Sequence, residues 1–256
     1  MIDLHCHLLP GIDDGAGDLG AALAMARMAV DDGIVTIACT PHILPGVYNN
    51  TRASIEAAVG NLADELEKAG IPLLLTSGAD VHVAPDLLAS LRQGRVPTIA
   101  NSRYFLFEPP DRIVPPRMDA FVFNLIAAGY VPVLTHPERL GWIEKQYAVV
   151  ERLAAGGVLI QLTAGSFLGQ FGRRARYWSE RMLDEGLVDL VATDAHDIDR
   201  RPPKLAPARD LISRRAGDDV AKLLVVENPL LVLEDVLVSR LNHRGGARVP
   251  MAEEGM

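Results

Sequence analysis

The feature that most constrains this chain is a regular alternation of short apolar runs with amphipathic segments. The runs are apolar throughout, which is typical of strands buried on both faces of a sheet. Helical patterns fill the intervals, so the alternation predicts an α/β fold with a parallel sheet and right-handed crossovers. Seven such units either close into a barrel or stay open as a doubly wound sheet. The candidate strands are residues 1–4, 34–39, 73–77, 104–107, 131–134, 158–162 and 187–192.

Helix boundaries are marked by capping residues. Asp18 is a candidate N-cap, Gly33 a candidate stop, and Thr51 opens the next helical pattern. An α/β barrel fits in about 250 residues as one domain, which agrees with this chain of 256 residues. We therefore expect a single domain over 1–240 and a flexible tail over 241–256. Further helices are expected near 84–93, 117–128, 145–155, 173–185 and 204–215.

Charge and hydropathy exclude several classes of partner. The net charge of −8 and the pI near 5.4 argue against nucleic acid or an anionic membrane surface as a partner. Because no stretch reaches 18 uninterrupted apolar residues, no membrane insertion is expected. The two cysteines, Cys6 and Cys39, do not make a disulfide framework, so a cytoplasmic location is the default expectation. The sequence leaves open whether the chain forms an oligomer.

Polar side chains gather where the candidate strands end. His5 and His7 stand two residues apart on an extended segment, so both imidazoles reach the same side. Asp194 and His196 have the same spacing, and Glu108 ends a buried apolar strand, where a carboxylate is costly unless it is paired or binds a metal. The carboxyl ends of parallel strands are where α/β enzymes place their active sites.

Taken together, these side chains predict a metal cluster. Imidazoles and carboxylates suit Mn, Fe, Zn or Co rather than a calcium cage. Eight ligands are too many for one ion, so two or three ions are expected. The candidate metal ligands are His5, His7, His42, Asp80, Glu108, His136, Asp194 and His196.

Two further acidic residues follow the first strand. Asp13 and Asp14 lie in a glycine-flanked loop, where turn formation is one interpretation. The alternative is that Asp14 accepts a hydrogen bond from a ligand histidine and so supports the metal site. His82 and His243 are left out of the predicted ligand set.

A cysteine-dependent phosphatase is excluded by spacing. Such an enzyme needs a thiolate and an arginine six residues later, so that one loop holds the phosphate. The sixth residue after Cys6 is Ile12, and the sixth after Cys39 is Pro45.

Six motifs in the sequence occur together. They are Ile2-Asp3-Leu4-His5-Cys6-His7, Pro10-Gly11-Ile12-Asp13-Asp14-Gly15, Thr40-Pro41-His42, His136-Pro137-Glu138-Arg139, Gln161-Leu162-Thr163-Ala164-Gly165-Ser166 and Asp194-Ala195-His196. With these motifs, the sequence over about residues 1–235 resembles the PHP (polymerase and histidinol phosphatase) superfamily. Within it, the chain is similar to the bacterial metal-dependent protein-tyrosine phosphatases of capsule and exopolysaccharide loci. The Pro-Gly-Ile-Asp-Asp-Gly and Thr-Ala-Gly-Ser runs separate this branch from the histidinol phosphatases.

The resemblance implies a distorted seven-stranded (β/α) barrel, similar to a TIM barrel, with a trinuclear site of divalent transition ions and manganese as the first choice. It also implies roles for single residues. His5 and His7 would bind one metal, Glu108 and His136 a second, and His42, Asp194 and His196 a third. Arg139 would hold the phosphate and Arg201 would assist. For Arg139 the alternative is a structural ion pair with Glu138 or Glu144.

One position departs from the family pattern. The family has Glu at the residue that bridges two metals, whereas this chain has Asp80. Asp is one methylene shorter, so it bridges only if the backbone or the metals shift by about one C–C bond length.

The function implied by the resemblance is removal of phosphate from tyrosines of a bacterial kinase of polysaccharide synthesis. Two alternatives remain open: a small-molecule phosphatase of the histidinol-phosphatase type, and a catalytically weak metal-binding regulator.

Overall fold

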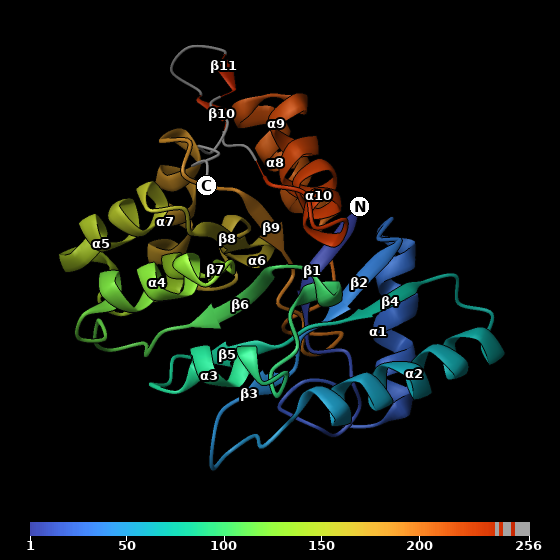
Figure 1. The fold of residues 1–256 in the computed structure, drawn as a ribbon. Coiled ribbons are helices and arrows are strands. Elements are labelled where there is room, and N and C mark those ends of the chain that lie inside the picture. The colour runs from blue at the N-terminus through green and yellow to red at the C-terminus, as the bar shows by residue number, and fades with distance from the viewer. Residues whose placement is uncertain (239–240, 243–246, 249–256) are drawn as a thin grey trace.

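The computed structural model describes residues 1–238, 241–242 and 247–248, and it has parallel strands surrounded by helices (Figure 1). Strands β1, β2 and β4 form one sheet, and β3, β5, β6, β7, β8 and β9 form another in that order. The strands are β1 (Ile2–Cys6), β2 (Thr36–Cys39), β3 (His42–Ile43), β4 (Leu74–Ser77), β5 (Asp80–His82), β6 (Tyr104–Glu108), β7 (Val131–Thr135), β8 (Leu159–Thr163), β9 (Leu190–Ala192), β10 (Leu241–Asn242) and β11 (Ala247–Arg248).

The two larger sheets are continuous with each other. After β2 the chain passes Thr40 and Pro41 and resumes as β3, and after β4 it passes Gly78 and Ala79 and resumes as β5. β2 pairs with β4 and β3 pairs with β5, all in parallel. A parallel bridge from Cys6 to Ala195 then joins β1 to the segment after β9. Six of the seven predicted strands thus pair directly with the next around the ring, and β4 connects to β6 through its continuation β5. This arrangement confirms the predicted α/β fold and closes the ring of strands.

Helices follow almost every strand and lie outside the strands (Figure 1). None of the helices within the described ranges is long and apolar enough to cross a membrane. The helices are α1 (Leu19–Asp31), α2 (Arg52–Lys68), α3 (Leu87–Arg92), α4 (Met118–Ala127), α5 (Ile143–Ala155), α6 (Ala164–Phe167), α7 (Gly172–Asp184), α8 (Ala206–Ala216), α9 (Asp218–Lys222) and α10 (Asn228–Leu233), with short turns η1 (Ile99–Asn101), η2 (Pro137–Arg139) and η3 (Leu223–Glu227).

The predicted caps start two of these helices. The Asp18 carboxylate accepts a hydrogen bond from the backbone N–H of Ala21 at 2.8 Å. Thr51 and Ser54 form a reciprocal capping box at the start of α2. Each cap satisfies a backbone donor that has no partner inside the helix.

Two buried clusters cover the two faces of the strands. The larger one fills the space between strands and helices and includes Cys6 and Phe105. The smaller one includes Tyr104 and Leu106 of β6. Because side chains alternate along a strand, Glu108 lies on the same face as Tyr104 and Leu106. The face of β6 that packs in the smaller cluster is therefore apolar at Tyr104 and Leu106 and ends in the carboxylate of Glu108.

Helix α10 and the segment that follows it cover one end of the smaller cluster. The Tyr104 hydroxyl donates to the Val236 carbonyl at 2.8 Å and accepts from the Val238 N–H at 3.1 Å. β10 and β11 pair antiparallel within the stretch 241–256. The other residues of that stretch lie outside the described residues, so the flexible tail stays a prediction.

Candidate metal centre

The first two histidines meet at the end of β1. The Nε2 atoms of His5 and His7 lie 3.2 Å apart, and both lie 3.4 Å from Oδ1 of Asp194. All three side chains are almost fully buried. The spacing of two residues therefore brings both imidazoles to one point, as expected for an extended segment.

The remaining candidate ligands surround this pair. They come from the first residues of β3 and β5, the last residue of β6 and the segments that follow β7 and β9. They form overlapping sets, and the ligand atoms within each set lie within 4.8 Å of one another. All eight predicted metal ligands contribute to this constellation, seven within the sets and Asp194 through the contacts given above. The sets are His7, Asp14, His42 and His196; His5, His7 and Asp80; His42, His82 and Glu108; and Asp80, Glu108 and His136.

Asp80 lies where these sets meet. Its Oδ2 is 3.5 Å from Nε2 of His5 and 3.6 Å from Nδ1 of His42. Among the described residues, neither of its carboxylate oxygens has a hydrogen-bond partner, although the side chain is fully buried. Burial and the neighbouring Glu108 carboxylate raise the pKa of Asp80 well above its usual range. A buried carboxylate without partners is costly unless a cation lies against it, so this donor set fits a metal ion.

The His136 ring is neutral, so one of its nitrogens has a lone pair for a metal ion. Burial and the nearby Arg139 guanidinium lower its pKa to about 3. Its Nε2 lies 3.7 Å from Oε1 of Glu108. His136 and Asp194 both adopt positive φ angles, of 35° and 52°. Left-handed backbone at residues other than glycine is costly and is concentrated at functional sites.

Neighbouring groups orient the first two histidines. The Nδ1 atom of His7 lies 2.7 Å from Oδ2 of Asp13, and Nδ1 of His5 lies 2.8 Å from Oε1 of Gln161. Each ring thus donates from Nδ1 and turns its Nε2 atom toward the site. Burial alone lowers the pKa of His7, but the hydrogen bonds that its ring donates to the Asp13 and Asp194 carboxylates outweigh this effect and raise the pKa to about 10.

The two acidic loop residues therefore lie in different places. Asp13 orients His7, a supporting role that the sequence analysis considered for Asp14. Oδ1 of Asp14 also lies against candidate ligands, 3.6 Å from Nε2 of His42 and 3.5 Å from Nε2 of His196, so its supporting role stays a prediction. Asp14 thus faces the site among the ring nitrogens.

Two arginines contact the same carboxylate. Arg139 and Arg201 each place a guanidinium nitrogen against Oδ2 of Asp194. Among the described residues, no hydrogen bond or ion pair joins Arg139 to Glu138 or Glu144. The Glu138 carboxylate is buried and accepts hydrogen bonds from the Thr163 N–H and the Ser166 hydroxyl. The two arginines therefore lie at the rim of the histidine cluster.

Four residues at the site were missed by sequence reasoning. Nε2 of His82 lies 2.9 Å from Oε2 of Glu108. The guanidinium groups of Arg139 and Arg201 lie over the ring of Phe171. Gln161 and Asp13 orient histidines. Asp13 and Gln161 stand inside noted motifs, which was a usable signal. His82 follows Asp80 by two residues on one strand and so shares its face. No sequence pattern points to Phe171.

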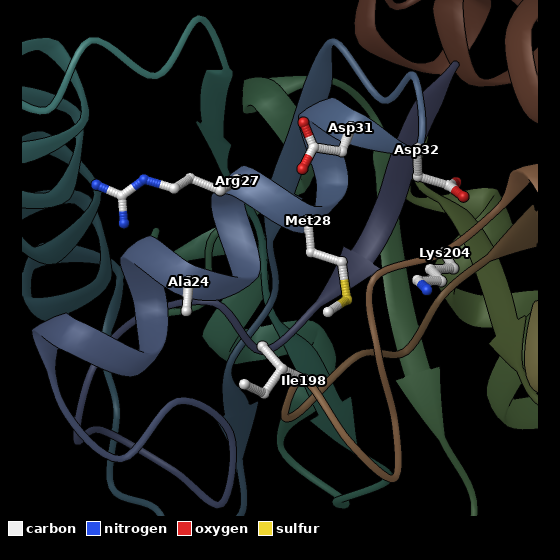
Figure 2. Close-up of a pocket in the computed structure, with 7 residues that line it drawn as sticks. All are labelled: Ala24, Arg27, Met28, Asp31, Asp32, Ile198 and Lys204. Atoms are coloured by element: carbon white, nitrogen blue, oxygen red, sulfur yellow. The ribbon is translucent and has the colours of Figure 1, made fainter.

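A separate surface pocket lies away from these residues. It has a volume of about 560 Å³ and lies between α1 and the segment that precedes α8 (Figure 2). Its lining includes Arg27, Asp32, Ile198 and Lys204. It contains none of the candidate metal ligands.

Comparisons with known proteins identify the family of this chain. A model of the family described as "Capsular polysaccharide synthesis, CpsB/CapC" matches residues 1–234. The chain is 34% identical over 240 residues to tyrosine-protein phosphatase YwqE of Bacillus subtilis, covering 94% of each. It is 29% identical to tyrosine-protein phosphatase CpsB of Streptococcus pneumoniae, covering 93% of this chain and all of that one.

Solved structures show the same relation. A crystal structure from a study of YwqE and CpsB, described as unique metal-dependent tyrosine phosphatases, matches with a TM-score of 0.91 at 34% identity, over 94% of this chain and 97% of that one. The lactonase Lmo2620 of Listeria monocytogenes, at 14% identity and a TM-score of 0.55, shares the fold alone; the match covers 91% of this chain and 94% of that one. The resemblance noted from the sequence is confirmed, and the chain belongs to the CpsB/CapC family of capsular polysaccharide synthesis.

Proposed function

We propose that this chain is a metal-dependent protein-tyrosine phosphatase. The observation that carries the proposal is Asp80, a fully buried carboxylate with no hydrogen-bond partner among the described residues, surrounded by histidines. Two arginines lie next to this cluster at Asp194. Its relatives YwqE and CpsB are tyrosine-protein phosphatases, which supports the same activity here.

We infer that two or three divalent ions bind in the overlapping sets of imidazoles and carboxylates. Manganese is our first choice, with iron, cobalt and zinc as alternatives. Such ions supply Lewis-acid charge that activates a water molecule and stabilises phosphoryl oxygens. The residues that would hold them are His5, His7, His42, Asp80, Glu108, His136, Asp194 and His196, with Asp14 and His82 as further donors.

The chain's own residues bind and orient the phosphate. Arg139 and Arg201 present planar forks of N–H donors, which match phosphate oxygens. Gln161 and Asp13 fix the ring orientations of His5 and His7, so these donors need no rearrangement when substrate arrives.

Exposure indicates the side from which a substrate enters. The Asp14 side chain is 48% exposed and that of Glu108 is 21% exposed, whereas those of His5 and Asp80 are fully buried. A phosphotyrosine side chain on the surface of a large protein is long enough to place its phosphate in such a site. Phenolate is a good leaving group, so little help from a general acid is needed.

We propose a phosphotyrosine protein as the substrate, specifically a bacterial tyrosine kinase of polysaccharide synthesis. The family's place in capsular polysaccharide synthesis supports this partner. We place the reaction in the cytoplasm, which the two unpaired and buried cysteines support.

A panel of substrates tests the proposal. Purified protein is incubated with manganese and with phosphotyrosine peptides, phosphoserine peptides or histidinol phosphate. We expect a large preference in kcat/KM for phosphotyrosine and no turnover after chelation. Faster hydrolysis of histidinol phosphate would identify a small-molecule phosphatase. Metal binding without turnover of any substrate would identify a metal-binding regulator.

A further inference from the structure

The ring of Phe171 supports both arginines of the site. The Cζ atoms of Arg139 and Arg201 lie 4.3 Å and 5.9 Å from the centre of this ring. Arg139 follows β7, Phe171 follows β8 and Arg201 follows β9, and β8 lies between the other two strands in the sheet. The middle strand therefore supplies one aromatic face to cations from both neighbours, within the range at which a ring attracts them.

The backbone on both sides of Phe171 fixes the position of its ring. Gly169 and Gly172 have φ angles of 80° and 84°, which let the chain turn back toward α6. A Cβ on Gly165 would lie 3.1 Å from Cε2 of Phe171 and 2.2 Å from Oε1 of Gln170. The glycine of the Thr-Ala-Gly-Ser run thus leaves the space that the ring and its neighbour occupy.

The same segment also fixes the backbone beside Arg139. Oε1 of Glu138 accepts hydrogen bonds from the Thr163 N–H at 2.9 Å and from the Ser166 hydroxyl at 2.7 Å. Residues 163–171 therefore hold Arg139 in two ways. Thr163 and Ser166 bind the neighbouring Glu138 and fix the turn, and Phe171 contacts the guanidinium group of Arg139.

We propose that Phe171 is a positioning residue that holds the guanidinium groups of Arg139 and Arg201 side by side, so that both donate to one phosphate. Two like charges that share one oxygen of Asp194 repel each other, and the negative face of the ring offsets this repulsion. Without an aromatic ring, the two groups separate and a phosphate meets them one at a time. The proposal rests on the proposed function in one respect, namely that these arginines bind phosphate.

Phosphate affinity tests the proposal without turnover. Inorganic phosphate is titrated into the metal-loaded protein by calorimetry, and KM and kcat are measured with p-nitrophenyl phosphate. Phe171→Leu keeps apolar volume but removes the aromatic face, so we expect phosphate affinity to fall about tenfold with unchanged metal content. Phe171→Tyr keeps an aromatic ring, so this variant should have the phosphate affinity of the unaltered protein. Phe123→Leu, the same change at an exposed ring of α4, should behave as the unaltered protein. Unchanged phosphate affinity in Phe171→Leu would overturn the proposal.

A double-mutant cycle separates positioning from a merely structural role. If the ring acts through the arginines, Phe171→Leu costs less phosphate affinity in an Arg201→Ala background than in the unaltered protein. An equal loss in both backgrounds, or loss of bound metal in Phe171→Leu, would show that the ring supports the fold instead. If the protein binds phosphate but hydrolyses no ester, the proposed function fails while the affinity cycle still decides the role of Phe171.

Discussion

At the scale of single residues, Gly15 packs directly against a histidine of the site. A Cβ placed there would lie 2.1 Å from the carbonyl oxygen of His7 and 2.5 Å from its Cβ, well inside the contact distance of about 3.5 Å between carbon atoms. The second glycine of the Pro-Gly-Ile-Asp-Asp-Gly run therefore lets the loop close against a metal-site histidine, while Asp13 orients the same ring.

We predict that Gly15→Ala displaces His7 and weakens metal binding by about 10- to 100-fold, the range seen when support of a ligand is lost. Calorimetric titration with manganese measures this. Gly17→Ala is the matched control, because nothing lies within 4 Å of a Cβ at that position. Equal affinities in the two variants would contradict the role of Gly15.

Arg139 differs from a structural arginine in its partner. Its ion pair is with Asp194 inside the site, not with Glu138 or Glu144. If it stabilises charge on the transferring phosphoryl group, Arg139→Ala should lower kcat by about 10²–10³, or roughly 3–4 kcal/mol. Arg139→Lys should fall between, because lysine keeps the charge but loses the planar fork. Steady-state kinetics with unchanged thermal unfolding would check this, and full kcat in the alanine variant would refute it.

At the scale of elements, the sequence located the seven apolar strands because each is a run that no helix period explains. It missed β3 and β5. Pro41 lacks an N–H and interrupts the ladder, and the short strands that resume after the breaks have too few residues to show a period. These two strands nevertheless carry His42 and Asp80, which the sequence placed in loops.

Contacts between distant loops were beyond sequence reasoning. The strand ends predicted which residues gather, since parallel strands share one edge. They could not predict which acid orients which histidine, because Asp13 and Asp14 are adjacent in sequence and differ only in side-chain direction. The helices α9 and α10 were also missed. They have five and six residues, which is too short a length to show a helical period in the sequence.

The junction between α1 and α8 provides a test of element packing. Oδ2 of Asp32 accepts hydrogen bonds from the N–H groups of Leu205 and Ala206, at 2.6 Å and 2.8 Å, at the start of α8. Asp32 lines the same pocket as Lys204 (Figure 2). The carboxylate thus caps a helix from a different part of the chain.

We expect Asp32→Ala to lower the free energy of unfolding by about 1–2 kcal/mol and to leave metal affinity and kcat unchanged. Urea denaturation of the metal-free protein measures the loss. Asp31→Ala, at the neighbouring exposed position, should change stability by less than about 0.5 kcal/mol. A similar loss in both variants would mean that the cap contributes nothing specific.

At the scale of the whole molecule, the candidate ligands lie at the end of β1, at the starts of β3 and β5, at the end of β6 and in the segments after β7 and β9. Ions bound there would cross-link nearly every strand of the ring, including the junction between Cys6 and Ala195 that closes it. The unfolded chain has no such arrangement, so metal binding stabilises the folded state through mass action.

This coupling gives a prediction for the global stability. At a metal concentration of 1,000 times Kd the free energy of unfolding should rise by about 4 kcal/mol, which for a chain of this size corresponds to an increase in Tm of roughly 8–16 °C. Asp80→Asn removes the buried carboxylate that lacks a partner among the described residues. This variant should unfold at the same or a higher temperature than the unaltered protein without metal, and it should show a smaller increase with metal. Differential scanning calorimetry with and without manganese measures both values. A Tm independent of metal in the unaltered protein, or an undiminished increase in Asp80→Asn, would show that Asp80 does not couple metal binding to folding.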